Sequence, residues 1–341
     1  MWSIWTILEF ILIPVVGFVL GCVFFYEFRK LYARMQMRRG PYFPARWYQV
    51  FADVLKLLSK KPKVPASAKK KLFYFAPFFA LACTIVALWL VPVAGFSPLS
   101  HYSIGVLLLI YLLYGPPVAY VIAGASSGSP YGVVGSKREL LLLMAYEVPF
   151  ILSLLSIALM VGHVEHATLS VQKIVNYQMM HTLNVFGVDL PAWFLFLNPF
   201  AAIALFLSVL GKLHVKPFDI VEAEHEIVYG PLAEYSGWLL GLFKIEGYVK
   251  FFLISTLIID FLLGGGLTSF TWLTIIYFIV TTFILVVIWA LICVLMPRYR
   301  PSDAFTWFIK YPLVFSILAI IWAYLIYMPW FDIPFAQITG R

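Results

Sequence analysis

The sequence predicts an all-α polytopic membrane protein, a single membrane domain over residues 1–341 with about eight transmembrane helices and both termini outside. Hydrophobic residues make up 63% of the chain and charged residues only 12%, and the mean hydropathy is +0.94. Apolar runs of about 20 residues, the length that crosses a bilayer, recur along the chain, and most charges fall between them. This composition excludes an ordinary soluble globular domain.

Eight apolar runs are long enough to be transmembrane helices. They lie near residues 4–26, 72–93, 102–123, 139–162, 191–212, 248–264, 269–296 and 310–329. The first run lacks the basic start and the small-residue cleavage site of a signal peptide, so we expect it to be a retained span.

The distribution of basic residues predicts the orientation of these spans. Of the 24 Lys and Arg residues, all but Lys173 and Arg341 fall on one side if the chain crosses the membrane eight times. Because positive charges concentrate in cytoplasmic loops, we expect four segments in the cytoplasm: 27–71, 124–138, 213–247 and 297–309.

The first of these segments, the basic loop 27–71, contains an amphipathic stretch. Between Tyr42 and Lys60 apolar residues recur at helical spacing among charged ones, and Pro62 follows. This pattern predicts a helix at the membrane interface, and a plain surface anchor with no further role is the alternative.

The acidic loop 213–247 is the most unusual segment of the chain. Five of the 16 acidic residues lie between Lys216 and Gly237, interleaved with apolar residues. On a helix Glu222 and Glu226 would share a face, and like charges this close are expected to raise one another's pKa. Coupled carboxylates of this kind suit a proton relay; a solvated acidic loop is the alternative. The five acids are Asp219, Glu222, Glu224, Glu226 and Glu234.

Four further acids fall within predicted spans, where an ionisable group is costly and a functional candidate. Glu139 and Glu147 would lie about 12 Å apart along one helix, as two steps of a path leading inward. Glu139 also has an alternative role as an interfacial ion pair with the adjacent basic residues. Glu9 and Asp260 lie near the predicted outer ends of their spans, where a simple interfacial position is the alternative.

Other kinds of site are not indicated by the sequence. Cys22, Cys83 and Cys293 are far apart in apolar runs, which argues against a disulfide framework or an iron–sulfur centre. His163 and His166 flank a carboxylate but lack a third ligand for a metal. The glycines of 124–135 do not form a phosphate-binding loop. The basic residues follow the membrane topology and do not indicate nucleic-acid binding.

Three separated stretches resemble one family of membrane proteins. The first contains Glu27-x-Arg-x-x-x-Ala-x-x-Gln36-x-Arg-x-Gly-Pro41 and then Gln49-x-x-Ala-Asp53-x-x-Lys-Leu57. The second runs from Gly124-Ala-Ser through Tyr131, Gly135 and Arg138 to Ala-Tyr-Glu147. The third contains Pro217-Phe-Asp-x-x-Glu-Ala-Glu-x-Glu226, Gly230 and Glu234-Tyr-Ser-Gly237, followed by Glu246. In this order they resemble the quinone-proximal membrane subunit of respiratory complex I, the counterpart of mitochondrial subunit 1, and its relatives in energy-converting membrane-bound [NiFe] hydrogenases.

The resemblance implies a non-redox, helical subunit that couples a peripheral electron-transfer arm to ion movement. No cofactor is expected in this chain; a [NiFe] centre and iron–sulfur clusters would reside in hydrogenase-like large and small subunits, with antiporter-like subunits as membrane neighbours. The implied location is the plasma membrane of an archaeon or bacterium. The implied proton pathway comprises Glu139, Glu147, Asp219, Glu222, Glu224, Glu226, Glu234 and Glu246, and the residues implied in arm docking and charge balance are Arg38, Asp53, Lys56 and Arg138.

Departures from the complex I pattern favour the hydrogenase branch, including related sulfur-reducing complexes. The chain has Gly40-Pro-Tyr-Phe-Pro where complex I forms usually have Gly-Pro-Asn and a second Gly-Pro, and Lys212-Leu-His-Val where they have Glu-Thr-Asn-Arg. These changes remove groups associated with the quinone chamber. A quinone-reducing subunit and a stand-alone ion transporter are the alternatives.

Overall fold

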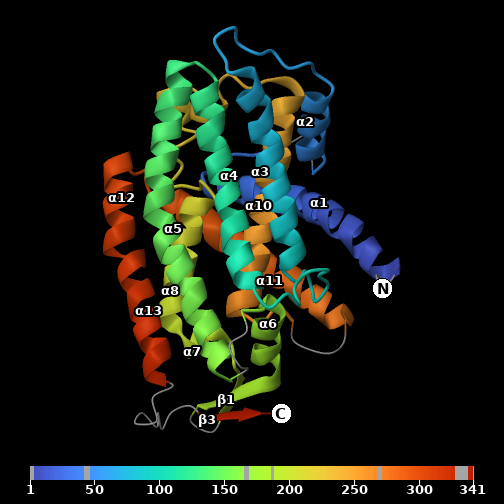
Figure 1. The fold of residues 1–341 in the computed structure, drawn as a ribbon, viewed down its shortest axis with the longest axis vertical. Coiled ribbons are helices and arrows are strands. Elements are labelled where there is room, and N and C mark those ends of the chain that lie inside the picture. The colour runs from blue at the N-terminus through green and yellow to red at the C-terminus, as the bar shows by residue number, and fades with distance from the viewer. Residues whose placement is uncertain are drawn as a thin grey trace.

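The computed structural model describes residues 4–41, 47–164, 169–185, 188–266, 271–326 and 337–340, and these form a bundle of mostly long helices (Figure 1). The predicted all-helical membrane fold is confirmed. The helices are α1 (Ile4–Met35), α2 (Gln49–Leu58), α3 (Lys70–Leu90), α4 (Gly105–Ser126), α5 (Pro130–Val164), α6 (Val171–Met180), α7 (Phe194–Leu197), α8 (Pro199–Lys212), α9 (Glu224–Ile227), the 3₁₀ turn η1 (Gly230–Leu232), α10 (Gly237–Leu262), α11 (Thr271–Leu295), α12 (Pro301–Lys310) and α13 (Pro312–Ile326).

Within the described residues, six helices are long and apolar enough to cross a membrane: α1, α3, α4, α5, α11 and α12 with α13. The other two predicted spans correspond to α8 and α10. Helix α8 has 14 residues, about 21 Å of helix, and the short α7 precedes it. Helix α10 has 26 residues but carries four charged side chains: Lys244, Glu246, Lys250 and Asp260. The orientation of the bundle relative to a membrane stays a prediction.

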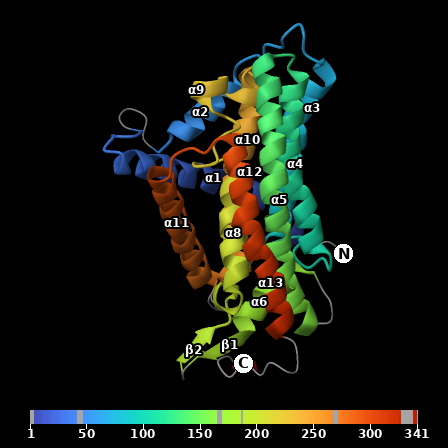
Figure 2. The same cartoon turned by 90° about the vertical axis from the view of Figure 1, so that its left-hand side faces the viewer.

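Most of the long helices stand side by side, whereas α1 lies across them (Figure 2). Helices α3, α4, α5, α8 and α13 pack as neighbours, and α1 packs on α10. A glycine permits this crossing, because a Cβ added at Gly21 would collide with the backbone carbonyl of Tyr248. Helix α2 lies against α1 and α10, where its Val50 and Val54 are buried with Cys22, Tyr26 and Tyr248.

Several boundaries differ from those predicted. Helix α2 begins at Gln49, and residues 42–46 of the predicted amphipathic stretch lie outside the described residues. Helix α10 begins at Gly237, so the end of the predicted acidic loop 213–247 is helical. Apolar periodicity does not predict that α10 begins at Gly237, because Lys244 and Glu246 interrupt the hydrophobic run. In the structure both side chains have partners inside the fold.

A small antiparallel sheet, which apolar periodicity did not predict, joins β1 (His181–Val185), β2 (Val188–Pro191) and β3 (Gln337–Gly340) in the order β2-β1-β3. Thr182 pairs with Pro191, and Leu183 pairs with Ile338. Strand β3 is far from β1 in the chain, so local sequence could not reveal their pairing. The strands lie at the end of the bundle near α6 (Figure 1).

Candidate functional site

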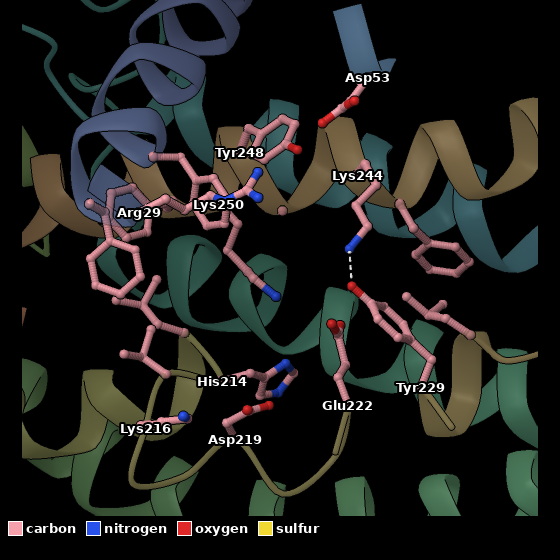
Figure 3. Close-up of a pocket in the computed structure, with 18 of the residues that line it drawn as sticks. Arg29, Asp53, His214, Lys216, Asp219, Glu222, Tyr229, Lys244, Tyr248 and Lys250 are labelled. Carbon is pink, nitrogen blue, oxygen red and sulfur yellow. Dashed lines mark hydrogen bonds between the residues drawn. The ribbon is translucent and has the colours of Figure 1, made fainter. Parts of the chain in front are cut away.

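A cavity of about 790 Å³ lies between α1, α2, α10 and the loop that follows α8. Figure 3 shows charged side chains extending into it from these separate elements, with Lys244 and Lys250 on α10 and Glu222 on the loop. Lys244 donates a hydrogen bond of 2.8 Å to the Tyr229 hydroxyl. The labelled lining residues are Arg29, Asp53, His214, Lys216, Asp219, Glu222, Tyr229, Lys244, Tyr248 and Lys250.

Glu246 forms the centre of a buried polar cluster beside this cavity. Its side chain is fully buried, and Lys250, one helical turn further along α10, lies 3.6 Å from Oε1. Thr84 donates to Oε1 and Tyr120 to Oε2, each at 3.4 Å. Three helices therefore contribute to the surroundings of one carboxylate.

Glu139 and His214 form a second buried acid–base pair. His214 Nε2 lies 3.1 Å from Glu139 Oε2, although the two atoms lack the alignment of a hydrogen bond. His214 lines the cavity while Glu139 is fully buried on α5. The predicted alternative for Glu139, pairing with the basic residues next to it in sequence, is wrong, because Glu139 is buried beside His214 and Arg138 pairs with Glu226.

Glu147 and Lys212 form the third pair, deeper in the bundle. Lys212 Nζ donates a hydrogen bond of 2.8 Å to Glu147 Oε2, and the two side chains are only 1% and 6% exposed. The ammonium group also donates to the Leu113 carbonyl and lies 4.3 Å from the centroid of the Phe150 ring. Removing either partner would leave an uncompensated buried charge.

Two loop acids form ion pairs with arginines from other elements. Asp219 accepts a hydrogen bond of 2.7 Å from Arg298, and Glu226 accepts one from Arg138. Burial raises the pKa of Asp219 against the opposing effect of Arg298, whereas the hydrogen bond from Arg138 lowers the pKa of Glu226.

The predicted arrangement of Glu222 and Glu226 on one helical face is wrong, because α9 covers only Glu224–Ile227. Glu226 is 49% exposed and its pKa is lowered, contrary to the expected mutual rise in pKa. Glu222 lines the cavity, and Glu234 does not. The side chain of Glu224 lies outside the described part of the structure.

The residues predicted for docking and charge balance occupy different environments. Asp53 and Lys56 of α2 line the cavity. Arg138 binds Glu226, and its guanidinium group also reaches the Ile220 carbonyl at 3.4 Å. Arg38 is exposed after the end of α1 and lies outside the cavity lining.

Several basic partners of the acids could not be recognised in the sequence. In the sequence, Lys250 and Arg298 indicate only the topology of the loops, and nothing about Lys212 or His214 identifies them as partners of buried acids. The one local signal was Lys250, four residues after Glu246. Lys212 and Glu147 are 65 residues apart, so no local spacing could have paired them. Within the described residues, no group of three or more His, Cys, Asp or Glu is arranged to hold a metal ion.

Comparison with known proteins decides the family. The sequence pattern described as NADH dehydrogenase matches residues 7–324. The chain belongs to this family. Its relatives include the NADH-quinone oxidoreductase H subunit of Acidovorax sp. (strain JS42), 31% identical over 338 residues that cover 96% of this chain and 92% of the relative. The corresponding protein of Geobacillus sp. (strain WCH70) is 32% identical over 240 residues, 70% of this chain and 67% of that one.

A solved structure is also similar to this member of the NADH dehydrogenase family. It is described as the membrane-bound sulfane sulfur reductase, an archaeal respiratory membrane complex, and one of its chains matches with a TM-score of 0.81. The identity is 28%, and the match covers 94% of this chain and 100% of that chain. The predicted resemblance to the membrane subunit of complex I and its relatives is confirmed at the level of the family.

Proposed function

We propose that this chain is the membrane-anchor and proton-pathway subunit of a redox-driven, ion-pumping complex of the hydrogenase or sulfur-reducing type. One observation carries the proposal: three buried acid–base pairs extend from a charged cavity into a membrane-spanning bundle. Buried ionisable groups in a membrane protein are costly and are characteristic of ion and proton paths. Similarity to a chain of the sulfane sulfur reductase complex supports this branch.

In the proposed mechanism, the charges of the three pairs influence one another. Lys212 interacts electrostatically with Glu147, Glu139 and Lys250, and Glu246 with Lys250, His214 and Glu222. A change of charge at the cavity therefore changes the energy of the buried carboxylates further inside. A redox module on the cytoplasmic loops would drive that change. Electrons do not pass through this chain.

The proposed partners are those that the resemblance implies. Hydrogenase-like large and small subunits would hold the [NiFe] centre and the iron–sulfur clusters and would dock through Arg38, Asp53, Lys56 and Arg138. Antiporter-like subunits would lie beside this chain in the plasma membrane of an archaeon or bacterium. The described residues include many exposed apolar side chains on α11 and α13, which lipid or such subunits would cover.

Quinone reduction is the second candidate function, and the cavity favours it. Its volume of about 790 Å³ is within the range of small-molecule sites, and α2 borders it, as a quinone chamber in this family would require. The relatives named NADH-quinone oxidoreductase add support. The departures at Gly40–Pro44 and Lys212–Val215 argue against this candidate. Quinone reduction by the purified complex, blocked by quinone-site inhibitors, would establish it.

The proposal is tested with the purified complex in sealed liposomes. We expect redox-driven ion uptake in the wild type and in Asp303→Asn, an exposed acid on α12. Glu147→Gln should retain electron transfer and lose ion uptake. Uptake by Glu147→Gln at the wild-type rate would overturn the pathway. Ion transport by this chain alone would instead favour a stand-alone transporter.

A further inference from the structure

A second cavity, of about 240 Å³, lies at the other end of the bundle. Residues of α6, the loop after α3, the C-terminal end of α10 and the start of α11 line it. Figures 1 and 2 show α6 at the end of the molecule opposite to α2, and therefore opposite to the main cavity. Gly95, Phe96 and Met179 at this second cavity are exposed, so it reaches the surface of the chain.

Asp260 is the acidic residue of this cavity, and its carboxyl group is fully buried. Neither Oδ1 nor Oδ2 has a hydrogen-bond partner among the described residues. A glycine leaves space for the group, because a Cβ added at Gly265 would lie 2.6 Å from Oδ1. Gly265 also has φ +65°, a conformation that disfavours other residues.

Where the structure describes the surroundings of Asp260, they provide no counter-charge. Among the described lining residues there is no Lys, Arg or His; Lys173 of α6 and His181 of β1 are not part of the lining. Tyr277 of α11 interacts with Asp260 electrostatically, but its hydroxyl donates to the Leu263 carbonyl. An ionised carboxylate in this position would carry a large desolvation cost.

The lining also argues against a metal cation as the occupant. A hard cation needs about six oxygen ligands, whereas Pro92, Phe96, Val175 and Met179 present apolar groups. The amide of Gln172 is already bonded to Ser100 and Asn176. A proton neutralises the carboxyl group without further ligands, and the space admits water.

We propose that Asp260 is a proton-binding site that exchanges its proton with solvent at the end of the bundle opposite the main cavity. The site is separate from the three acid–base pairs, and its protonation does not depend on the proposed redox partners. The alternative of a simple interfacial position does not describe this side chain, because it is buried under α6 and α11.

Infrared difference spectra between H₂O and D₂O test the proposal. They are recorded at pH 7, without turnover, on the full-length chain in its purified complex. We expect a carbonyl band of a neutral carboxylic acid that shifts in D₂O, disappears in Asp260→Asn and persists in Asp303→Asn. A spectrum of Asp260→Asn that retains the band, or a band that does not shift in D₂O, would overturn the proposal. Loss of the band when Na⁺ replaces choline would indicate a cation site and also overturn it.

A second measurement covers the case in which Asp260→Asn does not fold. Wild-type protein labelled with ¹³C only at aspartate carboxyl carbons should show the same band shifted to lower frequency. The other aspartates with described side chains, Asp53, Asp219 and Asp303, are each at least partly exposed. If the exchangeable band does not shift with this label, it does not belong to Asp260 and the proposal fails.

Discussion

Lys212, the last residue of α8, forms a buried ion pair with Glu147 at the middle of α5, with 2.8 Å between Nζ and Oε2. Both side chains have almost no contact with water, so each charge is stabilised by the other and not by solvent. The neighbouring rings of Tyr146 and Phe150 lie within 5.4 Å and 4.3 Å of the ammonium group. Each group of the pair therefore has a high desolvation cost and one specific counter-charge.

We predict that Lys212→Met destabilises the protein by about 3–5 kcal/mol, because it leaves the Glu147 carboxylate buried without a counter-charge. Thermal unfolding in detergent measures the effect. The double variant Lys212→Met with Glu147→Gln should recover most of the loss, since neither charge remains. A double variant as unstable as the single one would mean that packing dominates over the ion pair.

Lys250→Met should abolish redox-driven ion uptake while electron transfer continues. Glu246 would lose its only basic partner within 4 Å among the described residues and would retain its proton throughout the cycle. Ion uptake and electron transfer are measured on the same liposomes. Lys310→Met, at the exposed end of α12, is the matched control. Normal uptake in Lys250→Met would remove Glu246 from the pathway.

Glu226→Gln should lower the melting temperature at pH 7 but not at low pH. Because Arg138 lowers the pKa of Glu226 from its usual value of 4.5, the unfolded state binds more protons than the folded state as pH falls below that value. The stabilisation is therefore complete above the unfolded-state pKa and is lost as pH falls through the folded-state pKa. Melting curves of both proteins at pH 7 and at decreasing pH check this; a pH-independent difference would contradict it.

Gly21→Ala should destabilise the crossing of α1 and α10 by about 1–3 kcal/mol. The added methyl group meets the Tyr248 carbonyl, which belongs to backbone and cannot rotate away. Gly247→Ala on α10 is the comparison, because a Cβ there meets nothing within 4 Å, and better helix propensity predicts a gain of up to about 1 kcal/mol. Thermal unfolding of the two variants should change in opposite directions.

Much of the fold could be predicted from composition and periodicity. Long apolar runs predict helices in lipid, where backbone groups have no other partners, and α3, α4 and α11 fall within a few residues of their predicted spans. The start of α10 could not be predicted in this way. Its charged residues are typical of a loop in the sequence, but in the structure they form an ion pair and a hydrogen bond inside the bundle.

The class of protein, the approximate helices and the acidic residues worth attention followed from the amino-acid order alone, because hydrophobic length and charge distribution are local properties. The basic partner of each acid could be identified only from the packing of the helices: His214 for Glu139, Lys212 for Glu147 and Arg298 for Asp219. The same packing separates the buried Asp260 from the exposed Glu226. Desolvation and pairing depend on which helices lie together, and the two hydrogen-bonded pairs join residues 65 and 79 positions apart in the chain.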